Sequence, residues 1–398
     1  MNESFNKLNP WKFANYKPGK LHSRLVFGEL VDNLANEFII TITGSRQVGK
    51  SSLMEMLINH LLNGDISPDN ITYFNLDDYS LHEVFTDTSS FISFVNPSDN
   101  NIKYIFIDEV QRLHNAGLLL KSLYDLKLNI KFICSGSSQL EIKSNIKEHL
   151  VGRSRNFEIQ RLNFDESKGF TNNITNKQLF NNHLIYGAYP KVMLEADHKQ
   201  KQLLLRDIYN SYVQKDIIEF LNVDNPTIFN KLITLLAGQI GNLLNIDNIC
   251  NTLKLARSKV VKYIEILEAT YIIKLVYPYY KNYPKEITKT PKIYFLDLGL
   301  RNYALNNFND LELRQDKGEL FENFYYLELY SNDVYQLKTI NYWRTTNQTE
   351  IDFIVQEGTI TKAVEAKLSS TAKPKSFNTF AEYYPDSVSE LVTSKSYI

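Results

Sequence analysis

The stretch Gly44-Ser45-Arg46-Gln47-Val48-Gly49-Lys50-Ser51 decides how the first part of the chain folds. It fits the phosphate-binding pattern GxxxxGK[ST] at every defined position. Residues 38–43 before it form an apolar run typical of a buried strand, and residues 51–62 after it have a helical pattern. A chance glycine turn before a helix would need neither the full pattern nor these flanks. The stretch therefore predicts a phosphate-binding loop between a strand and a helix.

Each residue type in this loop has a chemical reason. Gly44 and Gly49 let backbone N–H groups turn inward around phosphates, where the following helix adds its positive end. Lys50 is expected to reach the β- and γ-phosphates, and the Ser51 hydroxyl to coordinate Mg²⁺. We expect ATP and Mg²⁺ as cofactors, with the nucleotide held by Gly44, Ser45, Arg46, Gln47, Val48, Gly49, Lys50, Ser51 and Ser52.

A second motif, Tyr104-Ile105-Phe106-Ile107-Asp108-Glu109, is an apolar strand that ends in two acids. Buried strands often end in acids, but two carboxylates there are costly unless a cation or water meets them. In this α/β context we expect Asp108 to hold Mg²⁺ through water and Glu109 to polarise the attacking water. No NKxD signature for guanine and no LSGGQ motif is found in the sequence, so ATP is favoured over GTP.

Two further candidates for the nucleotide site allow two interpretations each. Ser135 or Ser137, after the strand at 130–134, would sense the γ-phosphate, or the serines simply form a turn. Arg153 and Arg155 would stabilise transition-state charge, in cis or from a neighbouring subunit, or they lie on a solvated loop.

Composition excludes several classes of protein. The 398 residues carry 44 Lys and Arg against 45 Asp and Glu, so no bulk charge draws the chain onto nucleic acid. Cys134 and Cys250 are too isolated for a disulfide framework or a zinc site, which suits a reducing cytosol. No apolar leader or bilayer-length segment is found, so we expect a cytoplasmic protein with no membrane partner.

The order of periodic segments predicts the organisation of the chain. Residues 1–22 look like a polar arm, and strands alternating with helices up to about residue 165 predict a parallel sheet covered on both faces. A long helical run, 199–221, follows. Three helices and a strand-like segment then outline a winged helix-turn-helix, at 229–238, 246–253, 257–269 and 271–277. Its basic residues would face phosphate, or form a solvated helix face or protein contact: Lys254, Arg257, Lys259 and Lys262.

These motifs resemble a known prokaryotic group. The runs ITGSRQVGKSSL, FIDEVQRL, SGSS, LVGRSR and YGAYP are similar to AAA-superfamily ATPases related to the STAND and archaeal ATPase branches. KIYFLDLGLRN, GELFEN, YWR, EIDFIV and VEAK are similar to the C-terminal domain of unknown function in those proteins. The resemblance spans about residues 23–390 and implies an α/β P-loop ATPase domain (1–165), a helical connector with a winged helix (166–280) and an α/β nuclease-like domain (281–398).

The C-terminal region of this group resembles PD-(D/E)xK nucleases, which use a helix acid, a strand Asp and a Glu-x-Lys. The matching residues are Glu322, Asp352, Glu365 and Lys367. Strand alternation places Glu365 and Lys367 on one face. A turn at 358–359 would put Asp352 opposite Glu365, and a turn at 357–358 would leave them diagonal. Asp352 and Glu365, with Glu322 and Lys367, would hold a second Mg²⁺ or Mn²⁺; the alternative is a cross-strand ion pair, with Glu350 also beside Lys367.

Two hypotheses about function follow. The first is an ATP-driven machine that acts on DNA through the winged helix and a DNA-binding or DNA-cutting third domain. The second is an ATP-dependent signalling switch or scaffold whose nuclease-like domain is non-catalytic and contacts a partner protein or a second copy of the chain. A basic track from the winged helix to Asp352 would favour the first hypothesis.

Overall fold

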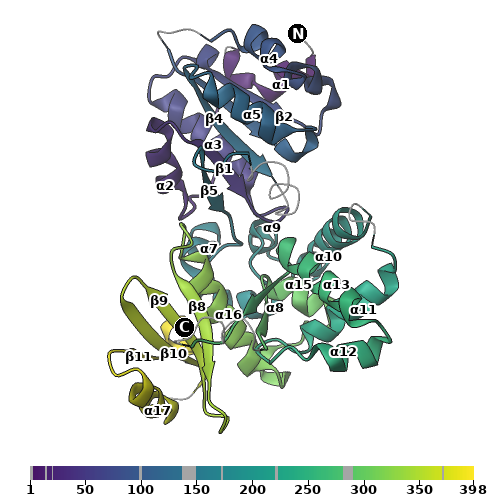
Figure 1. The fold of residues 1–398 in the computed structure, drawn as a ribbon, viewed down its shortest axis with the longest axis vertical. Coiled ribbons are helices and arrows are strands. Elements are labelled where there is room, and N and C mark those ends of the chain that lie inside the picture. Colours follow the sequence, from purple (N-terminus) through teal and green to yellow (C-terminus); the bar gives the residue numbers. More distant parts are fainter. Residues whose placement is uncertain are drawn as a thin grey trace. The chain divides into compact units, whose positions relative to one another are not determined.

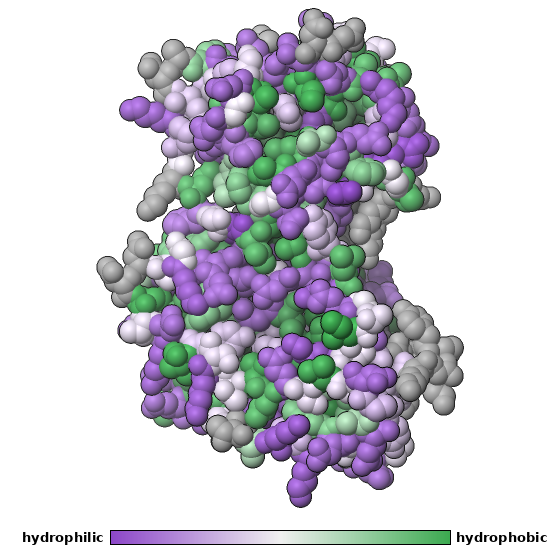
Figure 2. Space-filling view, turned by 90° about the vertical axis from the view of Figure 1, so that its left-hand side faces the viewer, coloured by the Kyte–Doolittle hydropathy of each residue, from purple (hydrophilic) through white to green (hydrophobic). Residues whose placement is uncertain are grey.

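The computed structural model describes residues 3–13, 16–19, 21–97, 101–136, 149–171, 174–219, 223–280, 290–369 and 372–398. The chain forms two compact units, residues 1–159 and residues 160–398 (Figure 1). In the described part of the chain, no helix is both long and apolar enough to cross a membrane. Figure 2 shows one face of the molecule, where hydrophilic residues are interspersed with small groups of hydrophobic ones, as on an ordinary protein surface.

The first unit is built on a five-stranded parallel sheet with the order β2-β3-β4-β1-β5. The strands are β1 (Ile39–Thr43), β2 (Ile71–Asn75), β3 (Lys103–Asp108), β4 (Ile130–Gly136) and β5 (Ser154–Glu158). All five residues of β1 are buried, which explains its uninterrupted apolar run. The predicted α/β class and parallel sheet are confirmed. β5 was not predicted, because only Phe157 among its residues is buried.

Helices cover both faces of this sheet (Figure 1). They are α1 (Glu3–Leu8), α2 (Phe27–Asp32), α3 (Lys50–Asn63), α4 (Thr88–Val95) and α5 (Ala116–Asp125), with short 3-10 turns η1 (Pro10–Lys12), η2 (Asn33–Ala35), η3 (Pro68–Asn70), η4 (Tyr79–Phe85) and η5 (Val110–Arg112). Phe91 of α4 and Leu120 of α5 share one apolar core with Phe74, Ile105 and Phe132 of the strands. Burial of this core fixes the sheet whose edge carries the predicted motifs.

The N-terminal segment is not the free polar arm that the sequence predicted. Phe5 and Trp11 are buried, and the Asn9 side chain is fully covered. The Asn9 amide donates to the Tyr73 carbonyl at 2.9 Å, and its oxygen accepts from the Tyr73 N–H at 2.7 Å. The Trp11 indole donates to the Ile71 carbonyl at 3.2 Å. These side chains bind backbone N–H and C=O groups at the outer edge of β2, where another strand would otherwise pair. Such long-range pairing leaves no periodic signal in the sequence.

The second unit begins with helices. They are α7 (Phe164–Phe170), α8 (Asn176–Tyr186), α9 (Pro190–Leu194), α10 (His198–Tyr209), the π-helical η7 (Asn210–Glu219), α11 (Pro226–Ala237), α12 (Ile246–Leu253), α13 (Arg257–Ala269) and α15 (Leu298–Ala304). The long helix predicted at 199–221 is therefore two elements, α10 and η7. α12 and α13 have the predicted bounds, and the winged-helix assignment stays a prediction.

Strand β6 (Ile273–Val276) pairs antiparallel with β7 (Lys292–Phe295). The two strands lie on opposite sides of the boundary predicted at residue 280, yet they form one sheet within the second unit. The parts predicted as 166–280 and 281–398 are thus joined by backbone hydrogen bonds, and the first unit ends at residue 159, six residues before the predicted boundary at 165.

A four-stranded sheet of order β11-β10-β9-β8 completes the second unit. Its strands are β8 (Thr339–Arg344), β9 (Glu350–Glu357), β10 (Ile360–Lys367) and β11 (Val388–Thr393), with α16 (Lys317–Ser331), α17 (Ser376–Tyr383), η8 (Leu311–Leu313) and η9 (Ser394–Ser396) around it. Ile360 pairs with Glu357, so the turn is the two-residue one at 358–359, where Gly358 has a φ of 58°. This is the register that sets Asp352 opposite Glu365.

Candidate functional site

The loop between β1 and α3 has a backbone that requires its glycines. Gly49 has a φ of 99°, in the left-handed region that a side chain disfavours. A Cβ atom on Gly44 would overlap the carbonyl oxygen of Ile159, whose N–H donates to the Thr43 carbonyl at 2.7 Å. Substitution of Gly44 would therefore deform the start of the loop, and substitution of Gly49 the point where α3 begins.

Two cationic side chains lie against this loop. The Lys50 ammonium is buried and donates to the carbonyl oxygens of Gly44 and Ser45 at 3.0 and 2.9 Å. The Arg24 guanidinium, also buried, donates to the Val48 carbonyl at 2.7 Å. Arg24 was not predicted, because it lies outside every motif, ahead of the first strand. Two positive charges therefore lie against the loop, which suits a phosphate.

Asp108 at the end of β3 is held by four donors. Its Oδ2 accepts from the Ser51 hydroxyl at 2.6 Å and from the Tyr73 hydroxyl at 2.7 Å. Its Oδ1 accepts from the Ser135 hydroxyl and, at 3.1 Å, from the Glu109 N–H. Strand order explains this meeting, because β4 lies between β1 and β3 and the carboxyl ends of all three share one edge. The structure thus brings Ser51, Asp108 and Ser135 together, whereas Ser137 lies outside the described residues.

Glu109 follows directly and is the first residue beyond β3. Its φ of 56° is left-handed, a conformation that costs a non-glycine residue on the order of 1 kcal/mol. The side chain accepts from the Gln111 amide at 2.5 Å, and the N–H also approaches the Ser135 hydroxyl at 3.3 Å. Burial and the neighbouring Asp108 raise the pKa of Tyr73 above its ordinary value, so its hydroxyl stays protonated as a donor.

Arg153 and Arg155 do not reach this edge of the sheet. Ser154 pairs with Ile39 at the start of β1, and the Ile39 N–H donates to the Arg153 carbonyl at 2.9 Å. The phosphate loop follows the other end of β1, about 16 Å away at roughly 3.3 Å per residue. Arg153 instead pairs with Asp125 at 2.8 Å. The prediction that it acts in cis is therefore wrong, because β5 runs parallel to β1 and the residues before it start at the opposite edge.

In the second unit Asp352 of β9 meets Glu365 and Lys367 of β10. The Lys367 ammonium lies 2.8 Å from Asp352 Oδ2 and 2.7 Å from Glu365 Oε2. The Ala366 N–H donates to Asp352 at 2.9 Å, and the Ser376 hydroxyl donates to Glu365 at 2.7 Å. Both carboxylates are therefore already bridged by a cation. Nowhere among the described residues do three or more His, Cys, Asp or Glu side chains form a group that could hold a metal.

Glu322 of α16 is held by a second lysine. Its Oε1 lies 3.1 Å from the buried Lys292 ammonium and accepts from the Tyr294 hydroxyl at 2.6 Å. Lys292 also lies 2.6 Å from Glu350, so Glu350 pairs with Lys292 and not with Lys367 as the ion-pair alternative assumed. Burial, with a smaller effect of Asp352, raises the pKa of Glu322 to about 7. Lys292 is the first residue of the run KIYFLDLGLRN, but no role was predicted for it, because its pairing with Glu322 and Glu350 appears only in the fold.

The basic residues of α12 and α13 are partly neutralised. Arg257 forms an ion pair with Asp247, and Lys259 lies 3.0 Å from Asp224. Two of the four cations expected to face phosphate thus already have acidic partners, which weakens the case for a continuous basic track.

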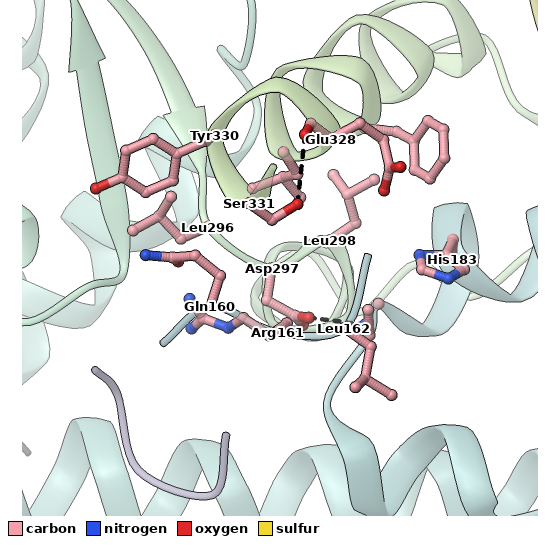
Figure 3. Close-up of a pocket in the computed structure, with 14 residues that line it drawn as sticks. Gln160, Arg161, Leu162, His183, Leu296, Asp297, Leu298, Glu328, Tyr330 and Ser331 are labelled. Atoms are coloured by element: carbon pink, nitrogen blue, oxygen red, sulfur yellow. Dashed lines mark hydrogen bonds between the residues drawn. The ribbon is translucent and has the colours of Figure 1, made fainter. Parts of the chain in front are cut away.

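A small cavity of about 20 Å³ lies elsewhere in the second unit (Figure 3). Glu328, Tyr330 and Ser331 line it from α16, opposite Arg161 and Asp297. Burial raises the pKa of Glu328 to about 8, and it also raises the pKa of Asp297. The volume suits about one water molecule, so this cavity is far too small for a nucleotide.

Residues 36–168 match a family model described as an AAA domain. The match supports an ATP-binding ATPase of the AAA superfamily. Residues 177–311 and 317–397 match two models described as domains of unknown function, DUF8612 and DUF4143. The DUF4143 match confirms the expected C-terminal domain of unknown function and gives no support to its nuclease-like character.

Relatives and solved structures add little about activity. An uncharacterized protein of Methanocaldococcus jannaschii is 26% identical over 85% of this chain and 76% of its own length. One of Haemophilus influenzae is 26% identical over 83% of this chain and 82% of its own length. AMPPCP-bound DnaA from Aquifex aeolicus is 17% identical, covers 61% of this chain and 86% of its own, and has a TM-score of 0.32. Hsp104 of S. cerevisiae, in complex with casein, is 16% identical, covers 60% and 49%, and scores 0.33. Scores this low establish neither a shared fold nor a shared function.

Proposed function

We propose that this chain binds ATP with Mg²⁺ at the loop after β1 and hydrolyses it. The observation that carries the proposal is the meeting of Lys50, Ser51 and Asp108 at one edge of the first sheet. Ser51 and Asp108 offer hard oxygen ligands of the kind that Mg²⁺ prefers, and one or two such ligands suffice when phosphates supply others. When bound, Mg²⁺ neutralises charge on the phosphates.

The side chains have separate roles in this proposal. Inward backbone N–H groups of residues 44–52 and the Lys50 ammonium bind the phosphates, while Ser51 and Asp108 hold the metal. Glu109 accepts a proton from the attacking water. It is the first residue after β3, and its backbone is left-handed. Ser135 bridges Asp108 and the Glu109 N–H, which suits a residue that links the phosphate to the acids.

Arg153 cannot supply transition-state charge in cis, because it lies at the far edge of the sheet. A neighbouring subunit or a partner protein would supply that cation, so a homo-oligomer belongs to the proposal. Arg153 itself is half-exposed beside Asp125 and remains a candidate to act in trans.

Action on DNA through the second unit is a weaker candidate. The convergence of Asp352, Glu365 and Lys367 favours it. Two observations favour instead a non-catalytic unit that serves as a switch or scaffold. The Lys367 ammonium already bridges both acids, and Arg257 and Lys259 already have acidic partners. A nicking assay with supercoiled DNA and Mg²⁺ or Mn²⁺ separates the two, and cleavage lost in Asp352→Asn would restore the nuclease hypothesis.

The ATPase proposal is tested by ATP binding to Lys50→Ala. The ammonium meets phosphate oxygens but contributes few core contacts, so tight binding should be lost while the fold persists. Lys127→Ala is the matched control, since Lys127 pairs with Glu37 outside the proposed site. Equal binding of labelled ATP by Lys50→Ala and wild type would show that this loop is not the nucleotide site.

A further inference from the structure

Among the donors to Asp108, Tyr73 is the one that comes from a strand outside every recognised motif. It lies on β2, where it pairs with Phe106 of β3, and its hydroxyl donates to Asp108 Oδ2 at 2.7 Å. Ser51, the other donor to Oδ2, is the residue expected to serve the metal and not the carboxylate. If it does so, Tyr73 is the remaining described side-chain donor to that oxygen.

We infer that Tyr73 is a positioning residue that orients the Asp108 carboxylate for the magnesium ion of the proposed ATP site. The inference rests on the proposed function and deepens it. Rotation about the terminal bond of an aspartate is soft, so a carboxylate fixed only through Oδ1 would swing. Ser135 and the Glu109 N–H fix Oδ1, and Tyr73 fixes Oδ2, which together define the plane of the group.

The N-terminal segment holds Tyr73 in place. Asn9 is fully buried and binds both backbone groups of Tyr73, at 2.7 Å to its N–H and 2.9 Å to its carbonyl. The second amide hydrogen of Asn9 goes to the Phe5 carbonyl at 2.9 Å, so both amide hydrogens are bound and the orientation of the side chain is fixed. Asn9, which lies far from the motifs in sequence, thereby supports the Asp108 carboxylate through Tyr73.

Tyr73→Phe tests this role because it removes one oxygen and keeps the ring. Asp108 Oδ2 retains its Ser51 partner, so the carboxylate is not left bare. Tyr104→Phe is the matched control. Tyr104 is also a buried tyrosine of this sheet, but it lies near the start of β3, at the other end of the strand from Asp108.

The measured quantity is the affinity for ADP with and without Mg²⁺, determined by calorimetry. This measurement does not depend on ATP hydrolysis. Tyr73→Phe should bind metal-free ADP like wild type but lose about tenfold or more of the affinity gained with Mg²⁺, the size expected for a hydrogen bond to a charged group. Tyr104→Phe should change neither affinity. An unchanged Mg²⁺ gain in Tyr73→Phe would overturn the inference. An equal loss with and without metal would do the same, because it would mean structural support of the loop.

These outcomes separate the inference from the proposed function. If wild-type protein binds no nucleotide, or gains nothing from Mg²⁺, the ATP site itself is wrong. If wild type gains from Mg²⁺ and Tyr73→Phe gains equally, the ATP site stands and only the role of Tyr73 falls.

Discussion

The buried acids of the two units differ in what surrounds them. Asp108 in the first unit receives three hydroxyl groups and one backbone N–H, all of them neutral. Asp352 and Glu365 in the second unit share the Lys367 ammonium, and Glu322 lies against Lys292. Neutral donors orient a carboxylate and leave its charge for an arriving cation, whereas an ammonium already cancels it. The comparison teaches that convergence of acids alone does not identify a metal site.

The largest effect is expected from substitution of Glu109, the acid that should accept a proton from water. Glu109→Gln should bind ATP like wild type but hydrolyse it about a hundred- to ten-thousandfold more slowly, because the amide cannot accept the proton. Phosphate release and ATP affinity are measured on the same preparation. Glu83→Gln, an exposed change in the same unit, is the control. Wild-type turnover in Glu109→Gln would mean that another group positions the water.

A second test compares the effects on stability of removing Lys292 and Lys367, the two lysines that pair with the acids of the second unit. Lys292→Met leaves the buried Glu322 carboxylate without its cation, whereas Glu350 is partly exposed and keeps Arg344, so the change should lower the free energy of unfolding by about 3–5 kcal/mol. The Lys367 side chain is 41% exposed, so solvent can replace its ammonium beside Asp352 and Glu365, and Lys367→Met should cost less than Lys292→Met. Urea unfolding at pH 7 measures both. Equal costs would contradict the view that the burial of the lysine, 3% exposed at Lys292 against 41% at Lys367, sets the cost.

A smaller effect is expected from pH at Glu328. Burial raises the pKa of its carboxyl to about 8, above the ordinary 4.5. The folded state therefore holds this proton more tightly, so the stabilisation is complete below about pH 4.5 and is lost as pH rises towards 8. Glu328→Gln can still accept from the Phe164 N–H and should flatten this decline. Glu319→Gln, exposed on the same helix, should leave it unchanged. An identical pH profile for Glu328→Gln and wild type would contradict this origin.

How much was predictable depends on whether the signal is local. The phosphate loop, β3 and its acids carry their chemistry in short runs, and α12 and α13 have the predicted bounds. Strand alternation was enough to bring Glu365 and Lys367 to one face. The edge strands β5, β8 and β11 were missed, because their mixed burial breaks any periodic pattern.

The remaining site residues could not be found from the sequence. Tyr73 meets Asp108, Asn9 meets Tyr73, and Lys292 meets Glu322 only after strands pair across long stretches of chain. The prediction that Arg153 acts in cis was wrong for the same reason, since only the parallel pairing of β5 with β1 shows at which edge it lies. Local patterns thus identified the residues expected to act on the nucleotide, but not the residues that hold those side chains in position.

The most direct test of the contrast between the units is the number of Mn²⁺ ions bound per chain with ADP, measured by equilibrium dialysis with ADP-only controls. We predict one ion for wild type, its loss in Asp108→Asn, and no change in Asp352→Asn. A second ion that disappears with Asp352→Asn, or a single ion that survives Asp108→Asn, would contradict the account.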